Sequence, residues 1–180
     1  GRIMGKRSDF QRVERDFYPT PYKAVEPLIQ HLPKEQFAFA EPCAGDGALV
    51  NCIETMTDGW CSWASDLEPQ TNNILTRHFR EINIDDLFEA DYIITNPPWD
   101  RSLLHPMIEY FTAFRPTWLL FDADWIHTKQ SIPYMGMLKK IVSIGRVKWI
   151  ADSKSVGKDN CCWYLFDRKQ SKNTKFYGRM

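Results

Sequence analysis

Strand-like apolar runs alternate with helical patterns from about residue 37 to residue 166. Alternation of this kind favours parallel strands in one sheet with helices on both faces. The sequence therefore predicts an α/β fold with a doubly wound, mostly parallel sheet of seven strands, the last two forming an antiparallel pair at one edge. We expect strands at 37–40, 60–64, 80–84, 92–95, 118–121, 142–150 and 162–166, and helices at 48–56, 71–78, near 134–138 and after a Ser102 cap.

The length of 180 residues suits one domain with its own hydrophobic core. We expect this domain at 17–167, after an N-terminal arm at 1–16 and before a basic, poorly ordered tail at 168–180. A first helix is expected to begin near Thr20-Pro21, and residues 1–3 are expected to be a remnant of an expression vector. No run approaches the ~18 apolar residues of a membrane span, and no signal peptide is visible.

Cysteine and histidine usage argues against disulfides and metal sites. The five cysteines are odd in number and include no C-x-x-C pair, which favours free thiols in a reducing compartment. The four histidines are scattered along the chain. We therefore expect no bound metal and a cytoplasmic protein.

Charge is unevenly distributed although the net charge is zero. Residues 35–100 hold 13 acidic and 2 basic residues, whereas residues 139–180 hold 11 basic and 3 acidic ones. Such asymmetry can mark a polyanion-binding face opposite a site for a cationic ligand. An ordinary solvated surface explains the same distribution, so charge alone leaves both interpretations open.

A rigid polar ledge follows the strand expected at 92–95, namely Asn96-Pro97-Pro98-Trp99. Proline fixes φ and pushes the preceding residue toward extended geometry. The Asn96 side-chain oxygen and the Pro97 carbonyl can accept hydrogen bonds from a planar amino group, while the Trp99 indole stacks on the ring that carries it. A Pro-Pro turn with a core tryptophan is the alternative that these four residues leave open.

A glycine turn, Glu41-Pro42-Cys43-Ala44-Gly45-Asp46-Gly47, separates the first expected strand from the following helix. Two glycines one residue apart permit a tight turn and close approach of a ligand. Ligands of open α/β sheets bind at the carboxyl ends of strands, where Asp66 can hold ribose hydroxyls. Because Val50 replaces the third glycine of the dinucleotide pattern, we expect an adenosine-containing cofactor, with a dinucleotide enzyme as the alternative.

Taken together, these motifs resemble those of S-adenosylmethionine-dependent N6-adenine DNA methyltransferases, in particular small phage and prophage enzymes. The resemblance covers residues 17–99, and no comparably specific motif follows. It implies a Rossmann-like methyltransferase fold. The matching stretches, in the family's order, are Phe17-Tyr18-Pro19-Thr20-Pro21, the glycine turn, Ser65-Asp66-Leu67, Asp85-Asp86-Leu87-Phe88 and the ledge.

The resemblance also implies roles for individual residues. S-adenosylmethionine would be the cofactor, S-adenosylhomocysteine the product, and the ledge residues Asn96, Pro97, Pro98 and Trp99 the catalytic set. Either Asp85 or Asp86 would contact the cofactor's adenine, and Asp66 its ribose. The implied cofactor-binding residues are Tyr18, Pro19, Thr20, Glu41, Pro42, Cys43, Ala44, Gly45, Gly47, Asp66, Leu67, Asp85, Asp86 and Asn96.

The expected reaction is methylation of the N6 amine of a flipped-out adenine in DNA, in a bacterial or phage-infected cell. Methylation of RNA adenine N6, of DNA cytosine N4 or of protein glutamine N5 remains an alternative, as does a non-catalytic subunit. The cytosine enzymes more often have Ser in place of Asn96, and the glutamine enzymes usually have Tyr in place of Trp99.

Target recognition is the least defined part of this prediction. No separate recognition domain is visible, so we expect relaxed sequence preference, or help from a dimer or a recognition partner. Three tryptophans, Trp125, Trp149 and Trp163, could stack on bases, but core packing is the favoured interpretation. The residues expected to contact phosphates are Lys129, Lys139, Lys140, Arg146, Lys148, Lys154 and Lys158.

Overall fold

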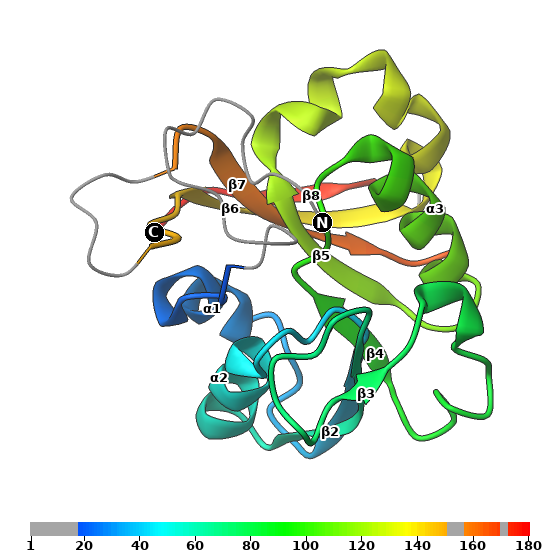
Figure 1. Cartoon of the computed structure of the whole chain (residues 1–180). Coiled ribbons are helices and arrows are strands. Elements are labelled where there is room, and N and C mark those ends of the chain that lie inside the picture. Colours follow the sequence, from blue (N-terminus) through cyan, green and yellow to red (C-terminus); the bar gives the residue numbers. More distant parts are fainter. Residues whose placement is uncertain (1–17, 151–156, 170–172) are drawn as a thin grey trace.

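The computed structural model describes residues 18–150, 157–169 and 173–180. One mixed sheet of eight strands runs through the molecule in the order β3-β2-β1-β4-β5-β7-β6-β8 (Figure 1). Strands β3, β2, β1, β4 and β5 are parallel, and β7 is antiparallel to both β5 and β6. The predicted fold class and the antiparallel pair are thus confirmed. The strands are β1 (Phe37–Glu41), β2 (Gly59–Asp66), β3 (Leu75–Thr76), β4 (Tyr92–Thr95), β5 (Thr117–Asp122), β6 (Leu138–Arg146), β7 (Asn160–Phe166) and β8 (Lys175–Tyr177).

Helices cover both faces of this sheet. Figure 1 shows α1 and α2 together on one side and α3 on the other. Each helix buries an apolar stripe, for example Leu28 of α1, Ile53 of α2 and Ile108 of α3. The helices are α1 (Tyr22–Ile29), α2 (Ala48–Met56) and α3 (Arg101–Thr112), with 3-10 segments η2 (Phe79–Glu81), η3 (Ala123–His127) and η4 (Lys129–Met137).

Tryptophans form a large part of the core. Trp125 and Trp163 are fully buried and Trp149 is 5% exposed, which confirms that these three side chains pack inside the protein. The Trp163 indole N–H donates to the carbonyl of Ala24 at 2.8 Å and thereby ties β7 to α1. Burial of large aromatic rings stabilises the packing of helices on the sheet.

Two predicted elements between residues 71 and 84 are wrong. The expected helix at 71–78 is a set of turns containing the short strand β3, and the expected strand at 80–84 is replaced by η2. Side chains explain the change, because His78 Nδ1 accepts from the Arg80 amide at 3.1 Å while Glu81 accepts from the His78 amide at 2.8 Å. This capping box fixes one tight turn in place of a strand.

The boundaries of α3 and β6 also differ from the prediction. Asp100, not Ser102, caps α3, because its carboxylate accepts from the Ser102 amide at 2.9 Å. Strand β6 covers 138–146 instead of 142–150, and the 3-10 segment η4 at 129–137 takes the place of the short helix expected near 134–138. The chain leaves the sheet after Arg146, directly beyond Gly145, which has a positive φ of 79°.

The eighth strand comes from the stretch expected to be a poorly ordered tail, so that expectation is wrong for residues 175–177. Strand β8 pairs in parallel with β6, and the Thr174 hydroxyl donates to the Leu138 carbonyl at 2.6 Å. The His31 ring packs against Tyr177 with 4.5 Å between centroids. The predicted N-terminal arm at 1–16, Phe17 and Lys154 lie outside the described residues.

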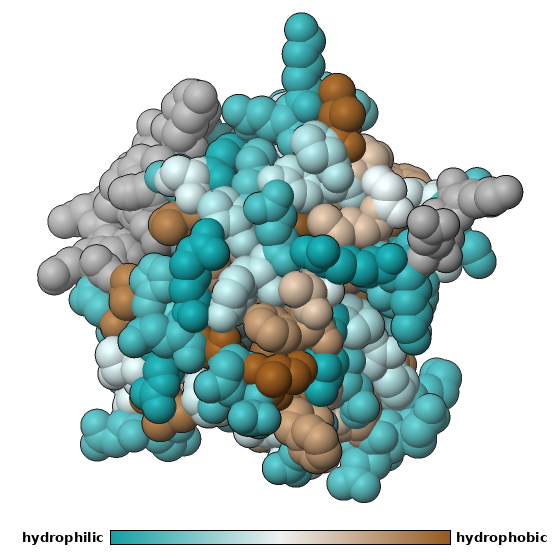
Figure 2. Space-filling model, turned by 90° about the vertical axis from the view of Figure 1, so that its right-hand side faces the viewer, coloured by the Kyte–Doolittle hydropathy of each residue, from teal (hydrophilic) through white to brown (hydrophobic). Residues whose placement is uncertain are grey.

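The surface on the α3 side is mostly hydrophilic, with smaller groups of hydrophobic residues between the polar ones (Figure 2). Among residues 18–150, 157–169 and 173–180, no helix combines the length and apolar character needed to cross a membrane. All five cysteines are free thiols, as predicted.

Candidate active site

One pocket gathers most of the predicted site residues at the carboxyl ends of β1, β2 and β4. Strands β1 and β4 are neighbours, with Phe39 opposite Tyr92, so the glycine turn and the ledge face the same space of about 160 Å³. Three predicted residues, Gly47, Asp85 and Asp86, are not part of the lining. The predicted residues that line it are Tyr18, Pro19, Thr20, Glu41, Pro42, Cys43, Ala44, Gly45, Asp66, Leu67, Asn96, Pro97, Pro98 and Trp99.

The glycine turn has a shape that other residues adopt only with strain. Gly45 and Gly47 have φ of 57° and 87°, and α2 begins directly after Gly47. A Cβ on Gly47 would meet only Ile74, at 3.8 Å, so backbone conformation and not crowding calls for glycine there. The Asp46 carboxylate accepts from the Ala48 amide at 2.9 Å and closes the turn onto the helix.

Asp66 shapes the turn as well as the pocket. One carboxylate oxygen accepts from the Gly45 amide at 2.9 Å, and the other accepts from the Glu68 amide at 2.8 Å. Hydrogen bonds to a charged acceptor are stronger than neutral ones. Asp66 therefore holds the Gly45 backbone next to a carboxylate that faces the pocket.

Glu41 is a buried carboxyl group between the turn and the ledge. It is 1% exposed and accepts from the Cys43 amide at 2.8 Å. Burial raises the pKa of Glu41 to about 8, with a smaller contribution from the Asp66 charge, while Thr95 and the backbone amides of Cys43 and Asn96 oppose the rise. Glu41 thus contacts backbone from both motifs and carries a proton near neutral pH.

The ledge begins with a defined amide orientation. The Asn96 side-chain nitrogen donates to the Thr20 hydroxyl at 3.3 Å. Because the nitrogen faces Thr20, the amide oxygen is the end of the group that can accept a hydrogen bond from a ligand. Thr20 is itself buried, so the segment before α1 forms one wall of the pocket beside the ledge.

Trp99 is both a pocket wall and a core residue. Its indole N–H donates to the Leu120 carbonyl at 3.1 Å, and its ring meets Trp149 edge to face with 5.8 Å between centroids. Only 7% of the residue is exposed. Core packing of Trp99 is therefore confirmed, and stacking of Trp99 on a substrate ring stays a prediction.

The aspartates expected near the cofactor's adenine lie in a separate turn. Asp86 accepts from the Asn83 amide at 3.0 Å, and Asn83 accepts from the Asp86 amide at 3.0 Å. Their contact with a cofactor stays a prediction.

One wall of the pocket, formed by the residues that follow β3, was not predicted from the sequence. The Arg77 amide donates to the Asp66 carbonyl at 3.0 Å and holds this segment beside the end of β2. The lining residues not predicted are Asp46, Ala48, Leu49, Glu68, Gln70, Arg77, His78, Phe79, Leu103 and Met107.

None of the described basic residues that were expected to contact phosphates lines the pocket. Lys140 lies over the Tyr177 ring, 5.7 Å from its centroid, at the β6–β8 end of the sheet. Contact of these basic residues with nucleic acid stays a prediction. In the part of the chain that the structure describes, no group of three or more His, Cys, Asp or Glu side chains could hold a metal ion.

Comparison with known proteins found no matching protein-family model and no matching curated protein. Solved structures do match. A modification subunit of a proposed type I restriction enzyme from Vibrio vulnificus aligns with 92% of this chain at 12% identity and a TM-score of 0.60. The fold is that of Rossmann-like methyltransferases. This chain spans about half of the Vibrio subunit, covering 47% of it.

Two further methyltransferase folds match over most of the chain. A proposed RNA methyltransferase from Pyrococcus horikoshii aligns with 88% of this chain and 91% of its own, at 14% identity and a TM-score of 0.63. A dimethyladenosine transferase from Plasmodium falciparum aligns with 84% of this chain and 62% of its own, at 13% identity and a TM-score of 0.51. At identities this low, the structural likeness shows the methyltransferase fold alone. The chemistry has to be argued from the residues of the site.

Proposed function

We propose that this chain transfers a methyl group from S-adenosylmethionine to the N6 amine of adenine in DNA. The observation that carries the proposal is a single pocket in which the Gly45–Asp66 turn faces the Asn96–Trp99 ledge. A donor site alone would suit many cofactor-binding proteins. A donor site that opens onto an amine-binding ledge suits methyl transfer to nitrogen.

The donor side of the pocket fits S-adenosylmethionine. The positive φ at Gly45 keeps side chains away from the turn, and Asp66 offers a carboxylate where ribose hydroxyls bind in this fold class. A carboxylate-bearing pocket also complements a cation. Tyr18, Pro19 and Thr20 would cover the methionine end. When bound, the cofactor supplies an electrophilic methyl group.

The ledge side fits an amine attached to an aromatic ring. The amine is a poor nucleophile, because its lone pair is delocalised into the ring. Hydrogen bonds from its N–H groups to the Asn96 oxygen and the Pro97 carbonyl enrich and orient that lone pair. The new carbon–nitrogen bond would replace the methyl–sulfur bond, so that S-adenosylhomocysteine leaves and the amine gives one proton to solvent. Positioning and electrostatics suffice for this step without a dedicated base.

Adenine in DNA is the substrate that the combined observations favour. Asn96 favours adenine over cytosine, the basic region at 139–180 suits a polyanion, and the structural matches include a subunit of a restriction enzyme. From the motifs at residues 17–99 we further propose a small phage-like enzyme that works in a bacterial or phage-infected cytoplasm, with a second copy or a recognition partner. RNA adenine, cytosine N4, protein glutamine and a non-catalytic role are the alternatives.

The proposed function is tested by incorporation of labelled methyl groups into unmethylated genomic DNA. Asn96→Ala should lower transfer by about 100-fold or more, because it removes a group that acts on the transition state. Asn51→Ala, an exposed site on α2 outside the pocket, is the matched control and should leave transfer unchanged. Undiminished transfer by Asn96→Ala removes the proposed role of that residue.

Mass analysis of digested product identifies the modified group. N6-methyladenine supports the proposal, and N4-methylcytosine selects the cytosine alternative. Methyl incorporation into RNA or protein but not into DNA selects those substrates instead. Tight binding of S-adenosylmethionine without transfer to any of the three polymers favours a non-catalytic subunit.

A further inference from the structure

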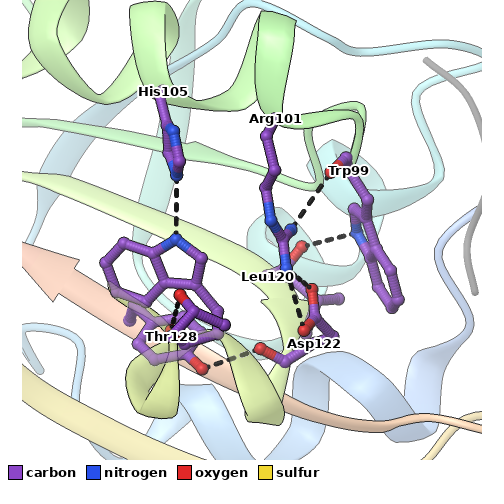
Figure 3. Close-up of polar contacts among 8 residues, drawn as sticks. Trp99, Arg101, His105, Leu120, Asp122 and Thr128 are labelled. Carbon is purple, nitrogen blue, oxygen red and sulfur yellow. Dashed lines mark hydrogen bonds and ion pairs between the residues drawn. The ribbon is translucent and has the colours of Figure 1, made fainter. Parts of the chain in front are cut away.

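An arginine outside the pocket joins the ledge to the neighbouring strand. Arg101, the first residue of α3, donates through Nη1 to the Trp99 carbonyl at 3.1 Å. Through Nη2 it donates to both carboxylate oxygens of Asp122, at 2.8 and 3.1 Å. Figure 3 shows the guanidinium lying between the Trp99 carbonyl and the Asp122 carboxylate.

Asp122 is a firm anchor for this contact. It is the last residue of β5, a strand that lies between β4 and β7 in the sheet. Its carbonyl accepts from the Tyr164 hydroxyl at 2.8 Å, and its side chain is 14% exposed. Arg101 therefore connects the ledge after β4 to the end of an interior strand.

The two ends of the ledge are held by different contacts. Pro97 and Pro98 have no backbone N–H, so they cannot donate to the ladder of hydrogen bonds that fixes β4. The Trp99 indole bond to Leu120 also ends on β5. The Asn96 end of the ledge is held by Thr20 and Glu41. The Trp99 end depends on bonds that reach β5, and Arg101 joins it to that strand through Asp122.

We propose that Arg101 is a positioning residue for methyl transfer, which fixes the ledge by joining the Trp99 carbonyl to Asp122. This inference rests on the proposed function of the ledge. Arg101 does not line the pocket, so it acts through Trp99 and not on a substrate directly. Because the glycine turn is held by its own bonds to Asp66, loss of Arg101 should affect transfer and spare cofactor binding.

The guanidinium is suited to this role in a way that lysine is not. A planar fork with five donors can serve a carbonyl and a carboxylate at the same time. A lysine side chain is shorter and ends in one nitrogen. Arg101→Lys should therefore keep the attraction to Asp122 but not donate equally well to the Trp99 carbonyl at the same time. We expect Arg101→Lys to lie between the wild type and Arg101→Met in transfer rate.

The first test compares Arg101→Met with Arg168→Met. Arg168 contacts the other end of α3, donating to the Thr112 hydroxyl and the Glu109 carbonyl, so each variant loses one positive charge and hydrogen bonds at one end of this helix. Arg101→Met should lower kcat by about tenfold or more with KM for S-adenosylmethionine within about twofold, as expected for a displaced reacting group. Arg168→Met should change neither constant, and equal kcat in both variants overturns the proposal.

Removal of the anchor separates positioning from a direct effect of the arginine charge. The variant Asp122→Ala keeps the Arg101 donors but removes the carboxylate that holds them. The positioning role predicts that kcat falls while KM for S-adenosylmethionine stays within about twofold. Wild-type kcat in Asp122→Ala overturns the role assigned to Arg101.

Fluorine NMR of protein labelled with fluorotryptophan tests the contact without any activity measurement. The Trp99 resonance is assigned by its loss in Trp99→Phe, and it should shift or broaden in Arg101→Met but not in Arg168→Met. An unchanged Trp99 resonance in Arg101→Met overturns the proposal. If that resonance changes while the wild type methylates no polymer, the proposed function fails and the positioning contact stands.

Discussion

The two walls of the pocket are built by different kinds of contact. The glycine turn is held by carboxylates bonded to its backbone amides, such as Glu41 to Cys43 within the turn and Asp66 to Gly45 from the end of β2. The ledge is held by side chains that reach distant segments, such as Asn96 to Thr20 and Trp99 to Leu120. The Glu41–Cys43 contact lies within a short stretch of sequence, whereas the Asp66–Gly45 bond needs two neighbouring strands and the ledge bonds need a larger part of the fold.

This difference predicts two classes of variant. Changes in the turn should weaken binding of S-adenosylmethionine, because they disturb the backbone that the cofactor approaches. Changes around the ledge should lower the transfer rate while the cofactor still binds. Glu41 contacts backbone of both walls, so a change at Glu41 tests most directly whether the two walls are independent.

The largest expected effect is the pH dependence of stability in Glu41→Gln. The pKa of Glu41 is raised from 4.5 to about 8, so the folded protein holds a proton that the unfolded chain releases between these values. The free energy of unfolding should therefore fall as pH rises from 4.5 through about 8. A glutamine side chain has no such proton to lose. Across that range the free energy of unfolding of Glu41→Gln, relative to that of the wild type, should therefore rise by as much as about 5 kcal/mol.

Urea unfolding at a series of pH values measures this difference. Glu26→Gln, an exposed change on α1, is the matched control and should follow the wild-type curve. A constant offset between the wild type and Glu41→Gln at every pH would show that Glu41 has an ordinary pKa in the folded protein.

The next effect is on cofactor affinity in Asp66→Ala. The change removes an acceptor from the Gly45 and Glu68 amides and should weaken binding of S-adenosylmethionine on the order of 100-fold. Calorimetric titration measures the affinity, with Asp58→Ala at an exposed turn as the control. The same titration of Asp85→Ala and Asp86→Ala decides whether either acid contacts the cofactor, and wild-type affinity in both would exclude it.

The same contrast between local and distant contacts explains how far the sequence could predict this structure. The turn was predictable because Gly45 and Gly47 follow an apolar run directly, and parallel strands place Asp66 beside them. Strands β1 and β4 lie side by side, as a doubly wound order allows, so the turn and the ledge meet at one end of the sheet.

The missed features depend on tertiary contacts. Residues 71–78 have a helical pattern, but the Arg77 amide bonds to the Asp66 carbonyl and the stretch becomes a pocket wall. Strand β8 was missed because its three residues gain their stability from pairing with β6, which no local pattern reveals. The bond from Arg101 to Asp122 spans two elements and was missed for the same reason.

The smallest predicted effect separates the two roles of Trp99. Trp99→Phe keeps an aromatic face in the pocket but leaves the buried Leu120 carbonyl without the indole donor, which should cost about 1–2 kcal/mol in the free energy of unfolding. Trp60→Phe, at a residue 38% exposed, is the matched control and should change stability by less than about 0.5 kcal/mol.

Three measurements on Trp99→Phe separate the two roles of Trp99: urea unfolding, S-adenosylmethionine titration and methyl transfer. If the indole bond positions the ledge, transfer should fall while cofactor affinity stays at the wild-type value, because the turn keeps its own bonds to Asp66. Equal losses of transfer and cofactor affinity would instead mean that the two walls move together. In that case Glu41, which contacts backbone from both, would be the residue that couples them.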